Sequence, residues 1–247
     1  MRSWGDLRAA RRWRNQVGAR LALRAGVARV PRKHLVGENS VNHCTWRSHN
    51  FSHALGTPEA KEKFLALLTE HKDEHGIEIN SYSIMNTHPH VQCRSTKGQK
   101  EFSKFWQVVN HRFARFHNKV HRARGQVVMD RMTSPTVQDG EHQLNVMRYG
   151  DVNPVRARLV DSAKEWAWSS YRHYAFGEKN ALITDAPEYL ALGDTPAQRR
   201  KAYVHLFATK LIQPFVVWRS DLVIGPFVGD PSWTAARAMA CGLSPSS

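Results

Sequence analysis

Two histidines separated by one residue, His88 and His90, are the first candidates for chemistry. They lie in the stretch SIMNTHPHVQCRS, residues 83–95, which we interpret as containing a β-strand. Side chains at positions i and i+2 of a strand point to the same side, so both imidazoles would face one site as metal ligands. Because the chain contains 14 histidines, about one such pair is expected by chance. The pair alone is weak evidence for a metal site.

A second candidate pair, Tyr149 and Asn153, lies four residues apart, so in a helix both side chains would share one face. A tyrosine hydroxyl, with an ordinary pKa of about 10, is a poor nucleophile unless a neighbour stabilises the phenolate or activates the electrophile. A divalent metal activates a phosphate by polarising a phosphoryl oxygen. Two histidines and an amide oxygen would supply three ligands and leave open positions, and Mg²⁺ or Mn²⁺ suits a phosphate-rich site although imidazole prefers softer metals.

Strands and helices that could position these groups follow from periodicity and capping signals. We predict strands over 41–47, 77–85 and 87–93, and helices over 58–75 and 100–122. The stretch LNVMRYGDVNPVRARLV, residues 144–160, carries Tyr149 and Asn153 and would place them on one face if it is helical. Thr57 and Pro58 give an N-cap and a first helical proline, and Gly76 is a candidate C-cap. The sequence therefore predicts the order strand, helix, two strands and helix, and its length suits one domain with appendages or two small domains.

Three residues next to the candidate groups break the usual rules for their elements. Pro89 cannot donate to a sheet ladder, so we expect its strand to be bulged there or to lie at a sheet edge. Gly150 and Pro154 weaken the helix that carries the tyrosine, and proline kinks or ends a helix. We therefore expect Tyr149 on a mobile segment.

Residues 100–122 predict an amphipathic helix with an aromatic stripe and a basic ridge. The stripe contains Phe102, Phe105, Trp106, Val109, Phe113, Phe116 and Val120 and is most simply core. The basic ridge contains Lys104, Arg112, Arg115, Lys119 and Arg122. Such a ridge is often only a solvated face, but Glu101 is the single acid in the segment, so few partners could neutralise it. We favour a surface that contacts nucleic-acid phosphates.

The overall charge points to the same class of partner. The chain has 36 Lys and Arg against 21 Asp and Glu, a formal net charge of +15, which is typical of proteins that bind polyanions such as nucleic acid. Ten of the basic residues and one acid, Asp6, fall within residues 1–34. We interpret residues 1–30 as a disordered basic extension, with a start codon placed too far upstream as the alternative.

Membrane and disulfide signals are missing from the sequence. No apolar run reaches the roughly 18 residues of a membrane span, and no secretory signal is recognisable, so we expect a cytoplasmic protein. Three cysteines without CxxC spacing indicate neither a disulfide framework nor a zinc ribbon. Cys93 lies an odd number of residues from both histidines and should face the opposite side of the strand.

The candidate residues also carry a resemblance to a known family. His88-Pro89-His90 resembles the His-hydrophobic-His motif of HUH-superfamily nucleases, with proline in place of the usual aliphatic residue. Tyr149 with Asn153-Pro154-Val155-Arg156-Ala157 resembles the Tyr-x-x-x-Asn-Pro-Val-Arg-Ala signature of REP-associated tyrosine transposases, a group of single-tyrosine insertion-sequence transposases. The stretch WSSYR, residues 168–172, is similar to one that follows that signature. The three motifs occur in the right order within residues 31–175.

The resemblance implies a fold, an activity and roles for particular residues. The fold would be of the α+β class, an antiparallel sheet flanked by helices in 31–175, as in HUH nucleases, with 176–247 as a C-terminal appendage of unknown role. Tyr149 would attack the DNA phosphate, while His88, His90 and Asn153 would bind Mg²⁺ or Mn²⁺. Arg156 would join the basic ridge in binding single-stranded DNA that carries a hairpin.

The sequence is also compatible with two other classes of function. One is a regulator of the same fold that binds DNA without cutting it. The other is a metal-dependent nuclease that uses activated water, in which Tyr149 only clamps a phosphate. A homodimer is also left open.

Overall fold

The computed structural model describes residues 30–208 and 226–243, so the predicted basic extension over residues 1–30 lies almost entirely outside the described residues. The chain divides into two compact units after Pro31, and the second unit begins at Arg32. Its strands are β1 (Val41–Thr45), β2 (Ile77–Ile84), β3 (Pro89–Ser95), β4 (Thr136–Val137) and β5 (Phe227–Val228). Its α-helices are α2 (Pro58–Lys72), α3 (Gly98–Val120), α4 (Glu141–Arg156), α5 (Tyr171–Phe176), α6 (Pro187–Leu190), α7 (Pro196–Ala208) and α8 (Pro231–Ala240).

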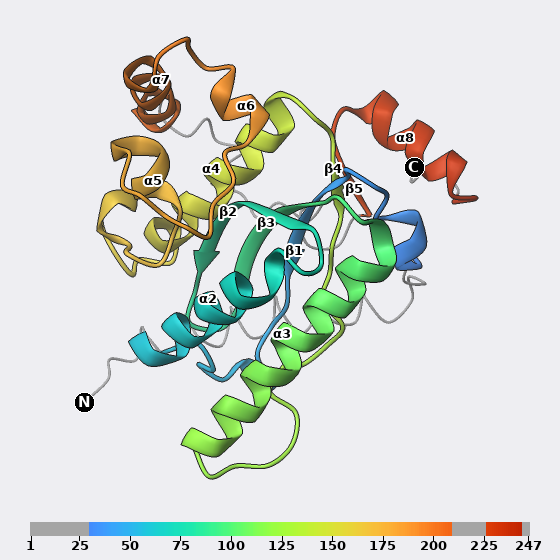
Figure 1. Cartoon of the computed structure of the whole chain (residues 1–247), viewed down its shortest axis with the longest axis vertical. Coiled ribbons are helices and arrows are strands. Elements are labelled where there is room, and N and C mark those ends of the chain that lie inside the picture. The colour runs from blue at the N-terminus through green and yellow to red at the C-terminus, as the bar shows by residue number, and fades with distance from the viewer. Residues whose placement is uncertain (1–29, 209–225, 244–247) are drawn as a thin grey trace, which may run out of the picture. The chain divides into compact units, whose positions relative to one another are not determined.

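The strands form one five-stranded sheet in the order β2-β3-β1-β4-β5 (Figure 1). The pairings of β2 with β3, β3 with β1 and β1 with β4 are antiparallel, whereas β4 and β5 are parallel. The sheet is therefore mixed, and the parallel pair departs from the purely antiparallel expectation. With helices flanking it, the sheet confirms the predicted α+β class.

Helices α2 and α3 pack side by side on one face of the sheet (Figure 1). Phe64 of α2 and Phe113 of α3 meet edge to face, with ring centres 5.4 Å apart, and both rings lie against Trp46, which follows β1. A fully buried ring of this kind contributes on the order of 3–5 kcal/mol. The aromatic stripe of α3 is thus core from Phe102 to Phe113, whereas Phe116 is only partly buried and Val120 is 54% exposed.

Helix α4 packs on the opposite face of the sheet. Val146 and Tyr149 of α4 pack with Val41 of β1, and the same cluster contains Val137 and Val228. Gln92 of β3 donates from its amide nitrogen to the backbone oxygen of Gln143 at 3.3 Å. Alternate residues of β1 and β3 therefore face α4, and the residues between them face α2 and α3.

The predicted boundaries of several elements need correction. Helix α2 starts at Pro58 as predicted, with the Thr57 side chain accepting from the Ala60 backbone N–H at 3.2 Å. It ends at Lys72 with Asp73 as its C-cap, because residues 73–76 form a separate turn in which the Gly76 N–H bonds to the Asp73 oxygen. Gly76 is therefore not the C-cap.

Pro89 lies in a central strand, so the expectation of a bulge or a sheet edge there is wrong. Strand β3 is flanked by β2 and β1. Pro89 is its first residue, so the missing N–H lies at the end of the hydrogen-bond ladder and does not break it. The register shift lies instead in β2, between Ile79 and Ser81. The predicted strand over 87–93 is displaced to 89–95 because residues 85–88 form the turn between β2 and β3.

Gly150 and Pro154 are both accommodated within α4. The helix runs from Glu141 to Arg156 and so ends two residues after Pro154, which occupies its last turn. Tyr149 and Gly150 are buried against the sheet rather than projecting from it. The predicted mobile segment is thus a packed helix that ends close to its proline, because the tertiary contacts outweigh the weak helix propensity.

Helices α5, α6 and α7 pack on α4 through a cluster rich in tyrosine. Tyr171, Tyr174, Tyr189 and Tyr203 pack around Met147 of α4. The Tyr203 hydroxyl donates to the buried Asp151 carboxyl at 2.8 Å, and burial raises the pKa of Asp151 to about 8. The predicted domain boundary at residue 175 falls within α5, and that boundary stays a prediction.

The outer edge of β2 is covered by residues 168–184. The Ile84 N–H donates to the Trp168 oxygen at 2.8 Å, the Ser170 N–H to the Tyr82 oxygen at 2.9 Å, and the Thr184 N–H to the Ile79 oxygen at 2.8 Å. The WSSYR stretch, residues 168–172, therefore bonds to the backbone of β2 and covers its outer edge. Within the described ranges, no helix is long and apolar enough to cross a membrane.

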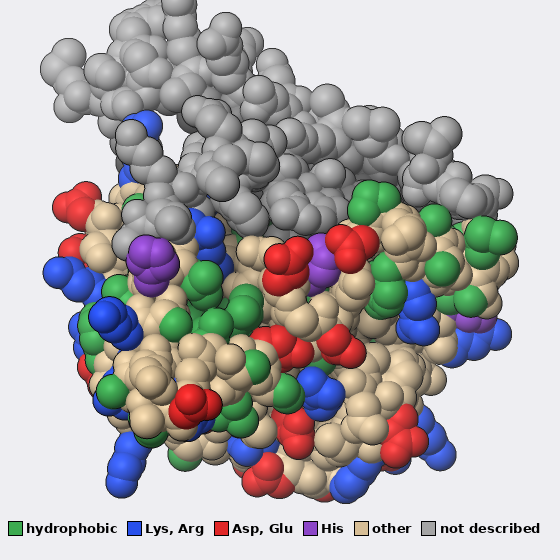
Figure 2. All heavy atoms as spheres, turned by 90° about the horizontal axis from the view of Figure 1, so that it is seen from above, with side chains coloured by type: hydrophobic (Ala, Val, Ile, Leu, Met, Phe, Trp, Pro, Cys, Tyr) green, Lys and Arg blue, Asp and Glu red, His purple; other side chains and the backbone are tan. Residues whose placement is uncertain are grey.

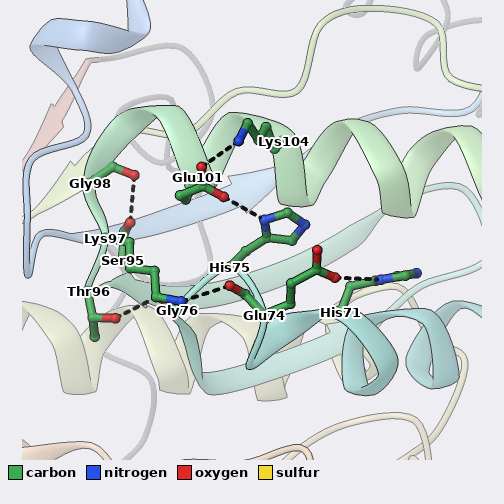
Figure 3. A network of polar contacts seen from close by, with 10 residues as sticks. All are labelled: His71, Glu74, His75, Gly76, Ser95, Thr96, Lys97, Gly98, Glu101 and Lys104. Atoms are coloured by element: carbon green, nitrogen blue, oxygen red, sulfur yellow. Dashed lines mark hydrogen bonds and ion pairs between the residues drawn. The ribbon is translucent and has the colours of Figure 1, made fainter.

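A polar network joins the end of α2 to the start of α3 (Figure 3). Glu101 Oε2 lies 2.9 Å from His75 Nδ1, and Lys104 Nζ donates to Glu101 Oε1 at 2.7 Å. Lys97 Nζ donates to the Glu74 backbone oxygen at 2.8 Å. The hydrogen bonds from Lys104 and His75 lower the pKa of Glu101 to about 2.

We expect Glu101→Gln to lower the free energy of unfolding at neutral pH. The folded pKa of Glu101, about 2, lies below the ordinary value of 4.5, so its stabilisation is present above pH 4.5 and is lost as the pH falls towards 2. Urea unfolding of both proteins at several pH values measures the difference, which should shrink on acidification. The exposed Glu62 supplies the control, Glu62→Gln. A difference for Glu101→Gln that does not change with pH would contradict the role of this network.

Candidate active site

The turn between β2 and β3 brings His88 and His90 together. The Met85 N–H donates to the His88 backbone oxygen at 3.0 Å and closes the turn, and His90 is the second residue of β3. The two rings lie 4.8 Å apart, nearly perpendicular. His90 is buried, while His88 is partly exposed. The pair predicted from spacing thus converges on the sheet face that α4 covers.

Tyr149 of α4 packs against this histidine pair. Its ring centre lies 5.5 Å from that of His90 in an edge-to-face arrangement. Burial raises the pKa of Tyr149, while the positive charge of Arg156 and the adjacent Asn153 side chain lower it. The guanidinium carbon of Arg156 lies 5.5 Å from the centre of the tyrosine ring. The residues of the Tyr-x-x-x-Asn-Pro-Val-Arg motif therefore form one group on α4.

Two residues of this site, His43 and Arg47, were missed by the sequence reasoning. His43 Nε2 of β1 lies 3.0 Å from His90 Nδ1, and its ring lies 6.2 Å from that of Tyr149. The positive charge of Arg47 lowers the pKa of Tyr149 and of both motif histidines. The sequence contained a signal for these two residues, because the side chains at positions 43, 45 and 47 share one face of the predicted strand over 41–47. The sequence did not show which strand would lie beside it.

The motif histidines are held in their neutral forms. Burial, then the charges of Arg47 and His43, lower the pKa of His88 to about 3. Burial, then His88 and His43, lower the pKa of His90 well below its ordinary 6.5. Both rings are therefore uncharged at physiological pH, which is the form that binds metal ions.

The residues present fit a divalent metal ion. His90 Nε2 and Asn153 Nδ2 are buried and have no hydrogen-bond partner. His88 Nδ1 lies 2.8 Å from the Thr87 hydroxyl, so Nε2 is the nitrogen left for a ligand. Among the described residues, no group of three His, Cys, Asp or Glu side chains could hold a metal ion. A site here would thus need the amide of Asn153, whose oxygen takes the place of Nδ2 when the amide is turned over.

Cys93 lies away from the histidines. Its thiol is 3.7 Å from that of Cys44, on the face covered by α2 and α3. Alternation along β3 predicted this separation. Cys93 therefore cannot join His88 and His90 around one ion.

The basic ridge of α3 does not reach the tyrosine, because α3 and α4 cover opposite faces of the sheet. Lys104 pairs with Glu101, and Arg112 Nη1 lies 2.5 Å from Glu70 Oε1 of α2. The expectation that few acids would neutralise the ridge is therefore wrong at Arg112, whose partner Glu70 is a tertiary contact on a neighbouring helix, whereas Lys104 pairs with Glu101 on α3 itself. Arg115, Lys119 and Arg122 are exposed.

The described surface carries both signs of charge. Figure 2 shows Lys and Arg interspersed with Asp and Glu on the face seen from above. The excess positive charge is therefore not gathered into one basic patch on that face. Arg156 is the predicted DNA-binding residue that lies beside Tyr149.

Comparison with known proteins gives a match among solved structures. No family model matches the chain, and no curated protein matches it. The chain is similar to a structure described as a REP-associated tyrosine transposase bound to a REP hairpin. The likeness covers 61% of this chain and 91% of that chain, with 16% sequence identity and a TM-score of 0.49.

We expect Arg156→Gln to raise the pKa of Tyr149 further. Removal of the cation beside the hydroxyl removes an interaction that favours the phenolate, while the burial that disfavours it remains. NMR titration of tyrosine labelled with ¹³C at Cζ measures this pKa, with Tyr149→Phe to assign the signal. Arg158→Gln, an exposed change two residues further on, should leave it unchanged. An unchanged pKa in Arg156→Gln would show that the guanidinium does not act on this hydroxyl.

Proposed function

We propose that the chain is a transposase-type DNA strand transferase that cleaves and rejoins single-stranded DNA through a 5′-phosphotyrosine. The observation that carries the proposal is the position of Tyr149. Its ring packs against His90, and the side chains of Arg156 and Asn153 lower the pKa of its hydroxyl. A buried tyrosine with two neutral histidines and a cation beside it suits attack on a phosphate better than a purely structural role.

The proposed reaction exchanges one phosphoester for another. The Tyr149 oxygen attacks the phosphorus of a DNA phosphodiester, and the oxygen–phosphorus bond forms as the bond from phosphorus to the 3′ oxygen breaks. The tyrosine loses its proton, and the departing 3′ oxygen gains one and becomes a free hydroxyl. The 3′-hydroxyl of another strand then reverses the exchange, so rejoining needs no ATP.

The chain's own residues supply charge and orientation for this exchange. Arg156 and Arg47 lower the pKa of Tyr149 against the effect of burial and so favour the phenolate. His88, His90 and Asn153 would hold Mg²⁺ or Mn²⁺, which supplies polarisation of a phosphoryl oxygen when bound. Edge-to-face packing on His90 fixes the tyrosine ring relative to the ligand nitrogens.

The DNA substrate in this proposal is a single strand with a hairpin beside the cleavage point, as the motif resemblance implies. Arg156 contacts the phosphate at the site. The exposed Arg115, Lys119 and Arg122 contact phosphates further away, on the side of the sheet covered by α3. Lys104 and Arg112 are not included, because acids neutralise them.

Two alternative functions are separated from this proposal by the covalent species. A regulator without cleavage would bind DNA and leave it intact. A nuclease that uses activated water would cut DNA without attaching it to protein. Only the tyrosine mechanism leaves DNA linked to the chain.

We expect Tyr149→Phe to abolish the protein–DNA adduct while DNA binding persists. The change removes only the attacking oxygen and keeps the ring that packs on His90. Denaturing electrophoresis with a labelled hairpin-containing strand and Mn²⁺ detects the adduct, and mass spectrometry locates it. Tyr171→Phe, in the tyrosine cluster, is the control and should retain the adduct. A phosphotyrosine at another residue, or an adduct that survives in Tyr149→Phe, would refute the assignment.

We expect excess EDTA and His90→Ala each to abolish cleavage and to leave most of the DNA affinity. The histidines serve the chemistry, whereas the exposed arginines and lysines serve binding. Cleavage is followed on denaturing gels, and affinity by fluorescence anisotropy with the same strand. His75→Ala, at a buried histidine outside the site, controls for lost packing. Full cleavage in excess EDTA would exclude the metal role.

A further inference from the structure

His43 and His90 are joined through their ring edges, across neighbouring strands. The nitrogens Nε2 of His43 and Nδ1 of His90 lie 3.0 Å apart, and the ring centres lie 5.2 Å apart. The difference between these two distances is about the sum of the two ring radii, so both nitrogens point along the line between the ring centres. With an angle of 6° between the planes, the rings are nearly coplanar, which is the geometry of an in-plane hydrogen bond.

One proton must lie between these two nitrogens, and it can belong to either ring. If His43 Nε2 carries it, His90 must carry its own proton on Nε2, where a buried N–H would have no acceptor. If His90 Nδ1 carries it, His90 Nε2 presents a lone pair instead. The second arrangement leaves no unpaired donor on His90 and directs the lone pair to the site.

We propose that His43 is a positioning residue that holds His90 in the Nδ1–H tautomer and so presents His90 Nε2 as a metal ligand. The inference rests on the proposed function, because it gives His90 a metal to bind. Ligand histidines generally donate their second ring N–H to a neighbouring acceptor, which fixes their orientation and tautomer. Here the acceptor is another imidazole, supplied by the adjacent strand β1.

The register of the sheet makes this contact a fixed one. Thr45 of β1 is the partner of His90 in β3, so His43 is offset from His90 by two residues along the neighbouring strand and shares its face. Both rings also lie edge to face against Tyr149, at 6.2 and 5.5 Å. His43 therefore orients the ligand without itself being counted among the ligands.

Nitrogen NMR of the metal-free full-length protein tests the tautomer directly. With ¹⁵N-labelled histidine and His90→Gln for assignment, we expect a protonated Nδ1 and an unprotonated Nε2 in His90. A protonated Nε2 would overturn the inference, whatever the protein does to DNA. In His43→Met, a change of similar size whose thioether sulfur is only a weak acceptor, we expect the His90 ring to lose its single tautomer.

Metal affinity supplies the second readout. The free Mn²⁺ signal in electron paramagnetic resonance gives the dissociation constant without any substrate. We expect His43→Met to weaken Mn²⁺ binding by about 10- to 100-fold. His43→Gln, whose amide oxygen can replace Nε2 as acceptor, should restore it to within a few-fold of wild type. His75→Gln, at a histidine paired with Glu101 outside the site, is the matched control and should bind like wild type.

The outcomes separate this inference from the proposed function. Equal Mn²⁺ affinity in wild type and folded His43→Met would overturn the inference and leave the tyrosine mechanism standing. A loss of affinity in His43→Met with restoration in His43→Gln, but without any Tyr149 adduct in wild type, would support the inference and refute strand transfer. No Mn²⁺ binding by the wild-type chain would overturn the inference together with the metal role.

Discussion

The alternation of side chains along β1 and β3 is the constraint on which the rest of the molecule depends. Residues of one alternating set, which includes Cys44 of β1 and Cys93 of β3, enter the core under α2 and α3. Residues of the other set, which includes His43 of β1 and His90 of β3, face α4. Because the period of a strand is two residues, a register slip of one residue would exchange the two sets. Core and site are thus specified by the same pairing of two central strands.

The sequence predicted the features that depend on local periodicity. The aromatic stripe of α3 recurs at helical spacing, so its burial followed from the pattern alone. The shared face of Tyr149 and Asn153 followed from their spacing in a helix, and the opposite facing of Cys93 and His90 from alternation in a strand. The pairing of the histidines with the tyrosine came from motif resemblance, because no periodicity relates residues so far apart in sequence.

The features that escaped prediction are those decided by tertiary neighbours. Nothing in the sequence distinguishes His43 from the other histidines among the 14, because its contact with His90 exists only where β1 lies beside β3. Glu70 lies on α2 and reaches Arg112 only because α2 and α3 pack together. Pro89 was expected to disturb its strand, yet a proline at the first position removes no bond that the strand needs. The conformational propensity of each residue was correct, but propensity does not show which residue of another element will lie beside it.

The covered edge of β2 limits how this protein can associate. An open edge strand presents a row of unpaired N–H and carbonyl groups on which an extended peptide, or the same strand of a second copy, can add to the sheet. Residues 168–184 already bond to the backbone of β2 at Ile79, Tyr82 and Ile84. A contact between copies at this side must therefore use side chains rather than sheet extension, and amyloid-like growth from β2 would first require that segment to detach.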